Sequence, residues 1–171
     1  VTIVPVVTNL GTANSTSNNT SISVTVPAGG VAVGKTIIVS FAMDVASGTV
    51  SVTDSKGNTY TNDADVTNGS NVRTVVFSAP VTTALVQNNI ITVTYPQVRA
   101  KAVSICYVSG LVSASRVDRT STSTGSSSNP SSGTTATTTQ ASELLIGAIG
   151  TESYSTTFTP GTNYTPLQSA I

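Results

Sequence analysis

The stretch GKTIIVSFAMD, residues 34 to 44, sets the fold class of this chain. Every second residue in its centre is large and apolar, and these residues are Ile37, Val39, Phe41 and Met43. A period of two residues places such side chains on one face of an extended strand. The stretch therefore predicts a β-strand with one face buried in a core.

Similar segments recur on both sides of this stretch. Alternating, β-branched segments are SISVTVP (21–27), GTVSVTD (48–54), RTVVFSAP (73–80) and IITVTYP (90–96). AKAVSICYVSG (100–110) and SELLIGAIG (142–150) are apolar on both faces, which predicts two central strands, and Gly147 and Gly150 leave room for close packing. No window of eleven or more residues has a helical period, and Gly-, Pro- and Asn-rich turns separate the segments. We predict an all-β fold: an antiparallel two-sheet sandwich, jelly-roll or Ig-like.

The length and the turns bound the domain organisation. The 171 residues suffice for a single sandwich domain spanning residues 1–171 without disulfides or metal. TDSKGNTYT, residues 53 to 61, is predicted to be a hairpin turn with Asp54 as its cap. NDADVTNGSN, residues 62 to 71, is expected to be a polar loop, and the Ser/Thr-rich residues 120–140 a long surface loop.

The charge of the chain excludes several classes of partner. Seven Lys and Arg residues balance seven Asp and Glu residues, so the formal net charge is zero. Such a chain has no basic face for nucleic acid and no polybasic run for anionic lipid. No apolar run approaches the ~18 residues of a membrane span. We expect no nucleic-acid partner and no membrane insertion, and weak charge repulsion between copies favours self-association.

The residue types leave little room for catalysis. The chain has no His and a single Cys, so triads and dyads that need His are impossible, as is His-ligated zinc. Cys106, between apolar neighbours, is interpreted as a small buried side chain. We predict a protein that is not an enzyme, with no catalytic residue and no cofactor.

Two motifs offer groups for ligand binding but have simpler interpretations. GGVAVGKT, residues 29 to 36, matches the letters of a phosphate-binding loop. Because a strand follows it where a phosphate loop needs a helix, we interpret it as a turn. Asp63 and Asp65, with Asn62 and Asn68, offer oxygen ligands for calcium, but their spacing does not match an EF-hand. A solvated loop without metal is the prediction there.

Composition and acceptor triplets indicate an extracellular protein at the cell surface. N-x-S/T triplets, which are candidate N-glycosylation sites, begin at Asn14, Asn18, Asn19, Asn68 and Asn163. Ser and Thr make up about a third of the chain, so such triplets also arise by chance. The first residue is Val, which we interpret as a processed or trimmed N-terminus.

The first seven residues, VTIVPVV, form a short apolar segment ahead of a polar run. We predict an N-terminal strand over residues 1–8 and a polar linker over residues 9–21. The strand either begins the chain's own sheet or is donated to an open sheet edge of a neighbouring subunit. An extended linker spans roughly 45 Å, which is enough to reach a second copy. The candidate donor residues are Val1, Ile3, Val4, Val6 and Val7.

The ordered segments also carry a resemblance. TVPAGG, SVTDSKGNTYT, ITVTYP, AKAVSICYVSGL and ASELLIGAIG together resemble a β-sandwich module of bacterial and archaeal cell-surface, adhesin-like proteins with a DS-x-GNTYT turn. The resemblance covers most of residues 20 to 165 and implies a fold, with no catalytic residue to transfer. The family pattern continues past PGTNYTPL with further strands, whereas this sequence stops at LQSAI. It implies a trimmed chain, or a sheet that obtains a strand elsewhere.

These observations predict a non-enzymatic extracellular structural protein. It is either a subunit of a pilus-like filament assembled head-to-tail by strand donation or an adhesin-type surface module that contacts surface glycans. The alternative is a carbohydrate-binding module, which needs exposed aromatic platforms. The chain has no Trp, and the candidate platforms are Tyr60, Tyr154, Phe158 and Tyr164.

Overall fold

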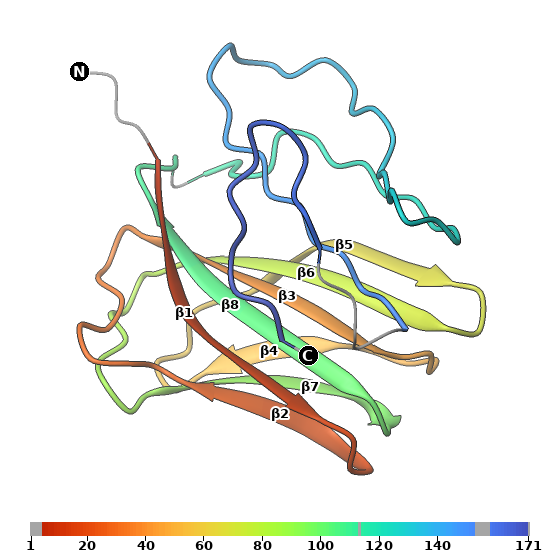
Figure 1. The fold of residues 1–171 in the computed structure, drawn as a ribbon. Coiled ribbons are helices and arrows are strands. Elements are labelled where there is room, and N and C mark those ends of the chain that lie inside the picture. Colours follow the sequence, from red (N-terminus) through yellow and green to blue (C-terminus); the bar gives the residue numbers. More distant parts are fainter. Residues whose placement is uncertain (1–4, 113, 153–157, 171) are drawn as a thin grey trace.

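The computed structural model describes residues 5–112, 114–152 and 158–170, and these contain eight strands and no helix. A five-stranded sheet has the order β1-β8-β3-β6-β5, and a three-stranded sheet has the order β2-β7-β4 (Figure 1). Each strand pairs antiparallel with its neighbours, which confirms the predicted antiparallel two-sheet sandwich. The strands are β1 (Val6–Ser15), β2 (Asn19–Thr25), β3 (Thr36–Asp44), β4 (Ser51–Asp54), β5 (Thr61–Asn68), β6 (Val72–Pro80), β7 (Ile90–Val98) and β8 (Lys101–Ser109).

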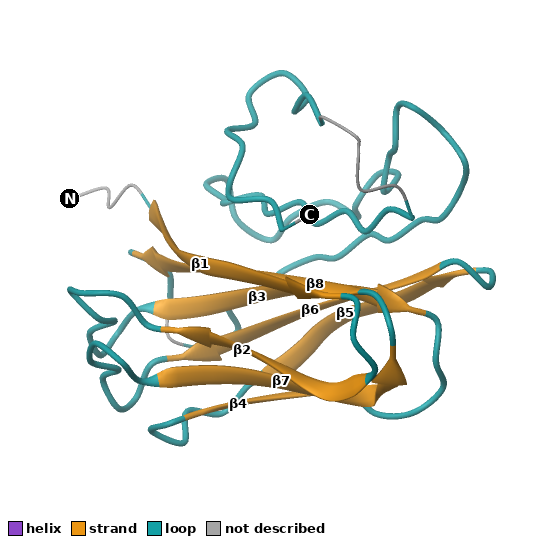
Figure 2. Cartoon of the chain, turned by 60° about the horizontal axis from the view of Figure 1, so that its bottom comes forward, coloured by secondary structure: helices purple, strands orange, loops and turns teal. Residues whose placement is uncertain are grey.

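The core lies between the two sheets, which Figure 2 shows as two layers. The alternating residues of β3 point into it, and Ile37, Val39, Phe41 and Met43 are at most 2% exposed. Ile91, Val93 and Tyr95 of β7 face them from the other sheet, with the Phe41 and Tyr95 ring centroids 5.0 Å apart. The two-residue period therefore predicted the buried face of these strands correctly.

A third layer covers the outer face of the five-stranded sheet. We call it the covering layer and define it as the described residues between Leu111 and Ala170. Figures 1 and 2 show it crossing above the sheet as an irregular chain. Leu144 and Ile146 pack there against an apolar cluster formed by Ile38, Cys106 and Val108. The covering layer thus shields the second apolar face of the central strands β3 and β8.

The predicted strand at SELLIGAIG is wrong, because residues 142–150 carry no strand. β3 and β6 each already pair with a strand on both sides, so this segment cannot add to either of them as a further strand. The segment instead packs face-on. A Cβ added at Gly150 would lie 2.2 Å from Thr74 Oγ1 and 3.0 Å from Ala42 Cβ, so the glycine permits this close approach.

Three boundary predictions near the strands are also wrong. The predicted linker 9–21 is mostly strand, because β1 runs to Ser15 and β2 begins at Asn19. The polar side chains of this stretch do not prevent its backbone from pairing with β8, and its Leu10 side chain is buried in the core. The predicted polar loop 62–71 lies largely within β5, which pairs with β6. TDSKGNTYT is not a hairpin, because β4 and β5 belong to different sheets.

The remaining organisation agrees with the sequence. Residues 120–140 are exposed, apart from the half-buried Ser121, and have no regular secondary structure. Asp118 closes the base of this loop, because its Oδ2 accepts a hydrogen bond from the Thr139 amide at 2.7 Å. In the described part of the chain, no helix has the length and apolar character needed to cross a bilayer.

Candidate functional site: the β1 edge

β1 forms one edge of the five-stranded sheet. It pairs only with β8, from Val6 opposite Ser109 to Ser15 opposite Lys101, and the register shifts between Asn9 and Gly11. At this bulge a Cβ on Gly11 would lie 2.9 Å from Val24 Cγ1, so the strand approaches β2 closely here. The outer side of β1 has no pairing strand among the described residues.

The structure places the predicted donor residues unevenly. Val6 and Val7 lie at the start of β1, opposite Ser109 and Val108 of the same chain. Val6 is exposed, whereas Val7 packs against the apolar cluster below the covering layer. Val1, Ile3 and Val4 lie outside the described residues. Within this single chain, the described part of the predicted donor strand therefore occupies its own sheet edge.

A buried lysine holds the connection between β1 and β2. Only Thr16, Ser17 and Asn18 separate the two strands. The Lys101 ammonium donates to the carbonyls of Ser17, Val98 (3.3 Å) and Arg99 (2.8 Å), and it lies 5.8 Å from the centroid of the Tyr95 ring. Burial lowers the pKa of Lys101, and the charge of Asp44 opposes this shift.

Sequence reasoning missed this role of Lys101. The available signal was one charge at the start of the otherwise uncharged, apolar segment AKAVSICYVSG. Because its donors reach three carbonyls in two turns, Lys101 joins the β1–β2 and β7–β8 connections. The turn after β1 is therefore fixed to the body of the sandwich from one side.

The opposite edge of the same sheet, β5, carries charge. Asp65 receives two hydrogen bonds from the Arg73 guanidinium, at 2.6 Å and 2.8 Å, and this contact lowers the pKa of Asp65. Asp63, half-buried on the same strand, has a raised pKa because of its burial, while the charge of Arg116 acts in the opposite direction. Charges on an edge strand discourage pairing with another chain. β1 contains no charged residue, so the two edges differ in their openness to a partner strand.

The candidate calcium ligands Asp63 and Asp65 lie on an edge strand and not in the solvated loop predicted for them. The Arg73 guanidinium already forms an ion pair with Asp65, and the surrounding residues form the strand β5. Across the described residues, no group of three or more His, Cys, Asp or Glu side chains could hold a metal ion. The pair Asp63 and Asp65 therefore acts as part of a charged edge.

The DSKGNTY turn is a structural connection between the sheets. Asp54 accepts hydrogen bonds from the Lys56 amide (2.8 Å), the Asn58 side chain (2.9 Å) and the Tyr60 hydroxyl (3.0 Å). Asn58 is buried and accepts from the amides of Thr82 and Thr83. Burial and the nearby Asp54 carboxylate raise the pKa of Tyr60. The motif thus ties β4 to the loop before β7, and its polar groups are used within the fold.

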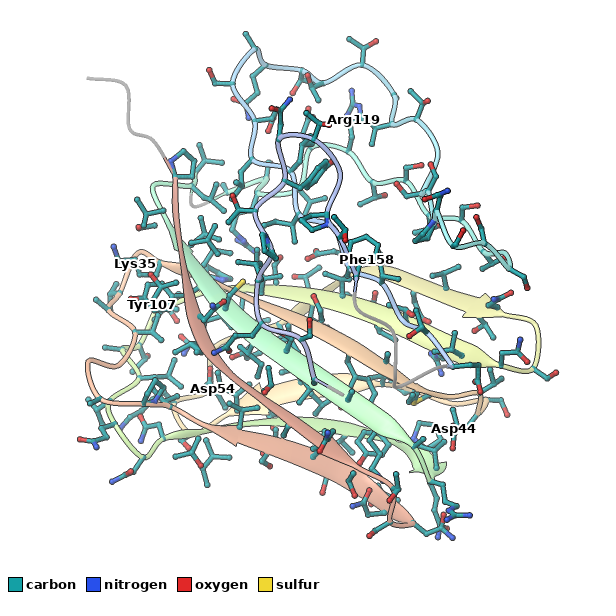
Figure 3. The ribbon with its side chains drawn as sticks, in the orientation of Figure 1. Lys35, Asp44, Asp54, Tyr107, Arg119 and Phe158 are labelled. Atoms are coloured by element: carbon teal, nitrogen blue, oxygen red, sulfur yellow. The ribbon has the colours of Figure 1, made fainter. Side chains whose placement is uncertain are left out.

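The aromatic candidates for sugar binding do not form one surface. Tyr60 packs against the core and binds Asp54, so its ring is not a free platform. Phe158 and Tyr164 are about half exposed in the covering layer, and Figure 3 shows Phe158 above the sheet. Tyr154 lies outside the described residues. Carbohydrate binding stays a prediction, with two exposed aromatic side chains among the described residues to support it.

The glycosylation candidates differ in accessibility. Asn14, Asn18 and Asn163 are exposed. Asn19 is half-buried and its Oδ1 accepts a 2.7 Å hydrogen bond from the Tyr95 hydroxyl, while Nδ2 of Asn68 donates to Gly125 O at 3.0 Å. Because a glycan is attached to Nδ2, Asn14, Asn18 and Asn163 are better placed to be acceptors than Asn19 or Asn68.

The remaining chemical candidates are engaged in the fold. In the phosphate-loop-like stretch, the amide of Gly34 donates to Val81 O and that of Lys35 to Ala32 O, and β3 starts at Thr36. Cys106 is buried beneath the covering layer, and burial raises its pKa to about 11. Lys35 and Asp44, at opposite ends of β3, and Arg119 in the covering layer are spread over the molecule (Figure 3).

Comparisons with protein-family models, curated proteins and solved structures found no match for this chain. The resemblance to bacterial and archaeal cell-surface modules therefore stays a prediction from the quoted motifs. The feature of the structure that bears on function is the sheet edge formed by β1, an uncharged strand that a three-residue turn joins to β2.

Proposed function

We propose that this chain is a non-enzymatic structural protein of the cell surface, whose copies assemble head-to-tail by exchanging β1. One copy inserts β1 beside β8 of the next copy and receives β1 from the previous copy. Such a contact is heterologous, and it produces a filament when its rotation does not close into a ring. The observation that carries the proposal is the uncharged ten-residue edge strand β1.

The exchange preserves the contacts that hold β1 in the single chain. The backbone pairs with β8 and the burial of Leu10 are the same whichever copy supplies the strand. The free-energy difference between the closed and exchanged forms is then small, and high local concentration favours assembly. A glycine at position 11 supports the close fit, because any side chain there meets Val24.

The turn between β1 and β2 is short, and this favours the exchange of β1 between copies. Thr16, Ser17 and Asn18 reverse the chain between two sheets, and short hinge turns make strand exchange more favourable. Lys101 fixes the carbonyl of Ser17 to the body. β1 therefore moves as a unit about this turn, while β2 keeps its pairing with β7.

The low charge supports the same role. Zero net charge lowers the repulsion between neighbouring copies in a fibre. Asn14 lies within the exchanged strand and Asn18 in the turn after it, and glycans at these exposed acceptor triplets would supply solubility. An extracellular location follows from the proposal and rests on it.

A disulfide across the β1–β8 pair tests the exchange. Asn14 and Ala102 are register partners, so the double variant Asn14→Cys/Ala102→Cys, made with Cys106→Ala, places two thiols opposite each other. After oxidation, exchanged copies are linked in series and give a ladder of multimers on a non-reducing denaturing gel. Electron microscopy of the unmodified chain should show filaments under the same conditions.

The matched control is Ser21→Cys/Thr94→Cys, whose disulfide joins β2 to β7 within the body. It should give a monomer band even in assembled material. A monomer band from the β1–β8 variant at every concentration, with no filaments, would overturn the exchange and leave an adhesin-type module.

A further inference from the structure

The turn between β5 and β6 contains the single Asn-Gly pair of the chain, Asn68–Gly69. Asn68 ends β5, β6 begins at Val72, and the amide of Asn71 donates to the Asn68 carbonyl at 3.0 Å, which closes the turn. Gly69 has a φ of +54°, in the left-handed region that glycine adopts without strain. The pair therefore supplies the turn that this hairpin needs.

The same pair brings a side-chain amide next to an unhindered backbone nitrogen. Gly69 is exposed, and a Cβ added to it would meet no atom within 4 Å, so solvent reaches its amide. Among the described residues, the Gly69 amide donates no backbone hydrogen bond, so no such bond has to break before its nitrogen reacts. This nitrogen is therefore available as a nucleophile toward the side-chain carbonyl of Asn68.

We propose that Asn68 is a site of spontaneous deamidation. The Gly69 nitrogen attacks Cγ of Asn68, and the new C–N bond closes a succinimide ring. The Cγ–Nδ2 bond breaks, and Nδ2 leaves as ammonia with the proton that the Gly69 amide gives up. Water then adds to either ring carbonyl and opens the ring, which leaves Asp or isoaspartate at position 68. Solvent water is the only co-reactant.

The amide group lost in this reaction holds the Ser/Thr-rich loop, residues 120–140. Nδ2 of Asn68 donates to Gly125 O at 3.0 Å, and Figure 1 shows this loop reaching toward the β5–β6 turn. A carboxylate has no proton to donate, so two acceptor oxygens would face each other after the reaction. Deamidation therefore releases the loop around Gly125, while the bonds between Asp118 and Thr139 still close its base.

The product carries its new charge far from the proposed filament contact. Position 68 ends β5, which lies at the opposite edge of the five-stranded sheet from β1. The inference therefore does not rest on strand exchange, and the β1–β8 disulfide ladder should be the same in Asn68→Asp as in the chain with Asn68. Because the formal net charge is zero at first, one added carboxylate separates the product clearly in isoelectric focusing.

Peptide mapping of the wild-type chain after incubation tests the reaction at its site. The tryptic peptide Gly57–Arg73 contains Asn68 and also Asn71, which is exposed in the same turn but precedes the branched side chain of Val72. Relative to a sample digested without incubation, Asn68 should convert to acid at least about tenfold faster than Asn71. The rate should rise with pH, because the attacking nitrogen must lose its proton. Equal conversion at both positions, or none at Asn68, would overturn the proposal.

Two variants of the turn separate the chemistry from the fold. Gly69→Ala places a methyl group beside the attacking nitrogen and should slow the loss of ammonia from Asn68 at least about tenfold. Because alanine is strained at this φ, its urea unfolding is measured alongside. Ser70→Ala keeps the Asn-Gly pair and removes the acceptor triplet, so no glycan can mask the reaction, and it should convert at the wild-type rate. A wild-type rate in Gly69→Ala would contradict attack by the Gly69 nitrogen.

A nitroxide attached to Ser126→Cys, in a Cys106→Ala background, reports the release of the loop. Ser126 is exposed next to Gly125. The label should become more mobile in the incubated chain and in Asn68→Asp, which carries the product charge without the reaction. A label on Thr137→Cys, at the closed base of the loop, is the control and should keep its mobility. Unchanged mobility at position 126 in Asn68→Asp would overturn the release of the loop.

Discussion

The sandwich and the covering layer contain the same kind of apolar segment and use it differently. IIVSFAM in β3 pairs on both sides, with β6 and β8, and buries its alternate residues in the core. LLIGAIG in the covering layer alternates as regularly, but it has no strand partner among the described residues and leaves two large side chains exposed. The difference shows that an alternating pattern specifies a buried face, whereas a strand also needs a free neighbouring edge.

The largest expected effect separates the two regions by stability. Phe41→Ala removes a fully buried ring that contacts Tyr95, and should lower the free energy of unfolding by about 3–5 kcal/mol. Leu144→Ala removes a half-buried side chain from the covering layer and should cost about 1 kcal/mol. Urea unfolding of both variants measures the contrast. Equal losses would mean that the covering layer is part of the core.

The next effect concerns the connection between the sheets. Asn58→Ala removes a buried side chain that binds Asp54, Thr82 and Thr83, and leaves their groups unpaired. It should lower the free energy of unfolding by about 2–3 kcal/mol. Lys56→Ala, an exposed change in the same turn, is the control and should have little effect. If both variants unfold at the wild-type urea concentration, the turn does not hold the sheets together.

A smaller effect tests how the covering layer is seated. Gly150→Val places methyl groups against Thr74 and Ala42, so the segment should lift from the sheet and uncover Cys106. The labelling rate of the Cys106 thiol at neutral pH should rise at least tenfold, about 1.4 kcal/mol of local opening. Gly147→Val faces open space and is the matched control. Unchanged labelling in Gly150→Val would show that the segment does not protect the thiol.

The smallest effect distinguishes the two sheet edges through pH. Arg73 lowers the folded pKa of Asp65, so the pair stabilises the fold above the ordinary Asp pKa and loses this contribution as pH falls through the folded value. Because the pair is partly exposed, the loss should stay below about 1 kcal/mol. Urea unfolding at about pH 6 and about pH 2.5 should show a steeper loss in wild type than in Asp65→Asn. Equal pH dependence in both would contradict the ion pair.

The fold was predictable where side-chain pattern and backbone pairing agree. Ile37 and Val93 lie in the core as their alternation predicts. The sequence did not reveal that β4 and β5 separate into different sheets, because that depends on distant partners such as Thr82 binding Asn58. Nor did it reveal that Leu144 would lie on a sheet face, because edge occupancy is a property of the assembled sheet.

The candidate site was predictable only in part. The apolar N-terminus pointed to an edge strand, and Val6 and Val7 do lie in β1. Its true extent to Ser15 was missed because TNLGTANS has one large apolar residue, Leu10. The role of Lys101 was missed because its partners are backbone carbonyls, which carry no sequence signature.

Hydrogen exchange tests most directly the claim that strand pairing separates the two regions. Amides of Ile37–Met43 should be strongly protected, because β3 pairs with a strand on each side. Amides of Leu144–Gly150 should exchange quickly, because no backbone hydrogen bond joins them to another described residue. Protection of Leu144–Gly150 to the level of Ile37–Met43 would contradict the claim.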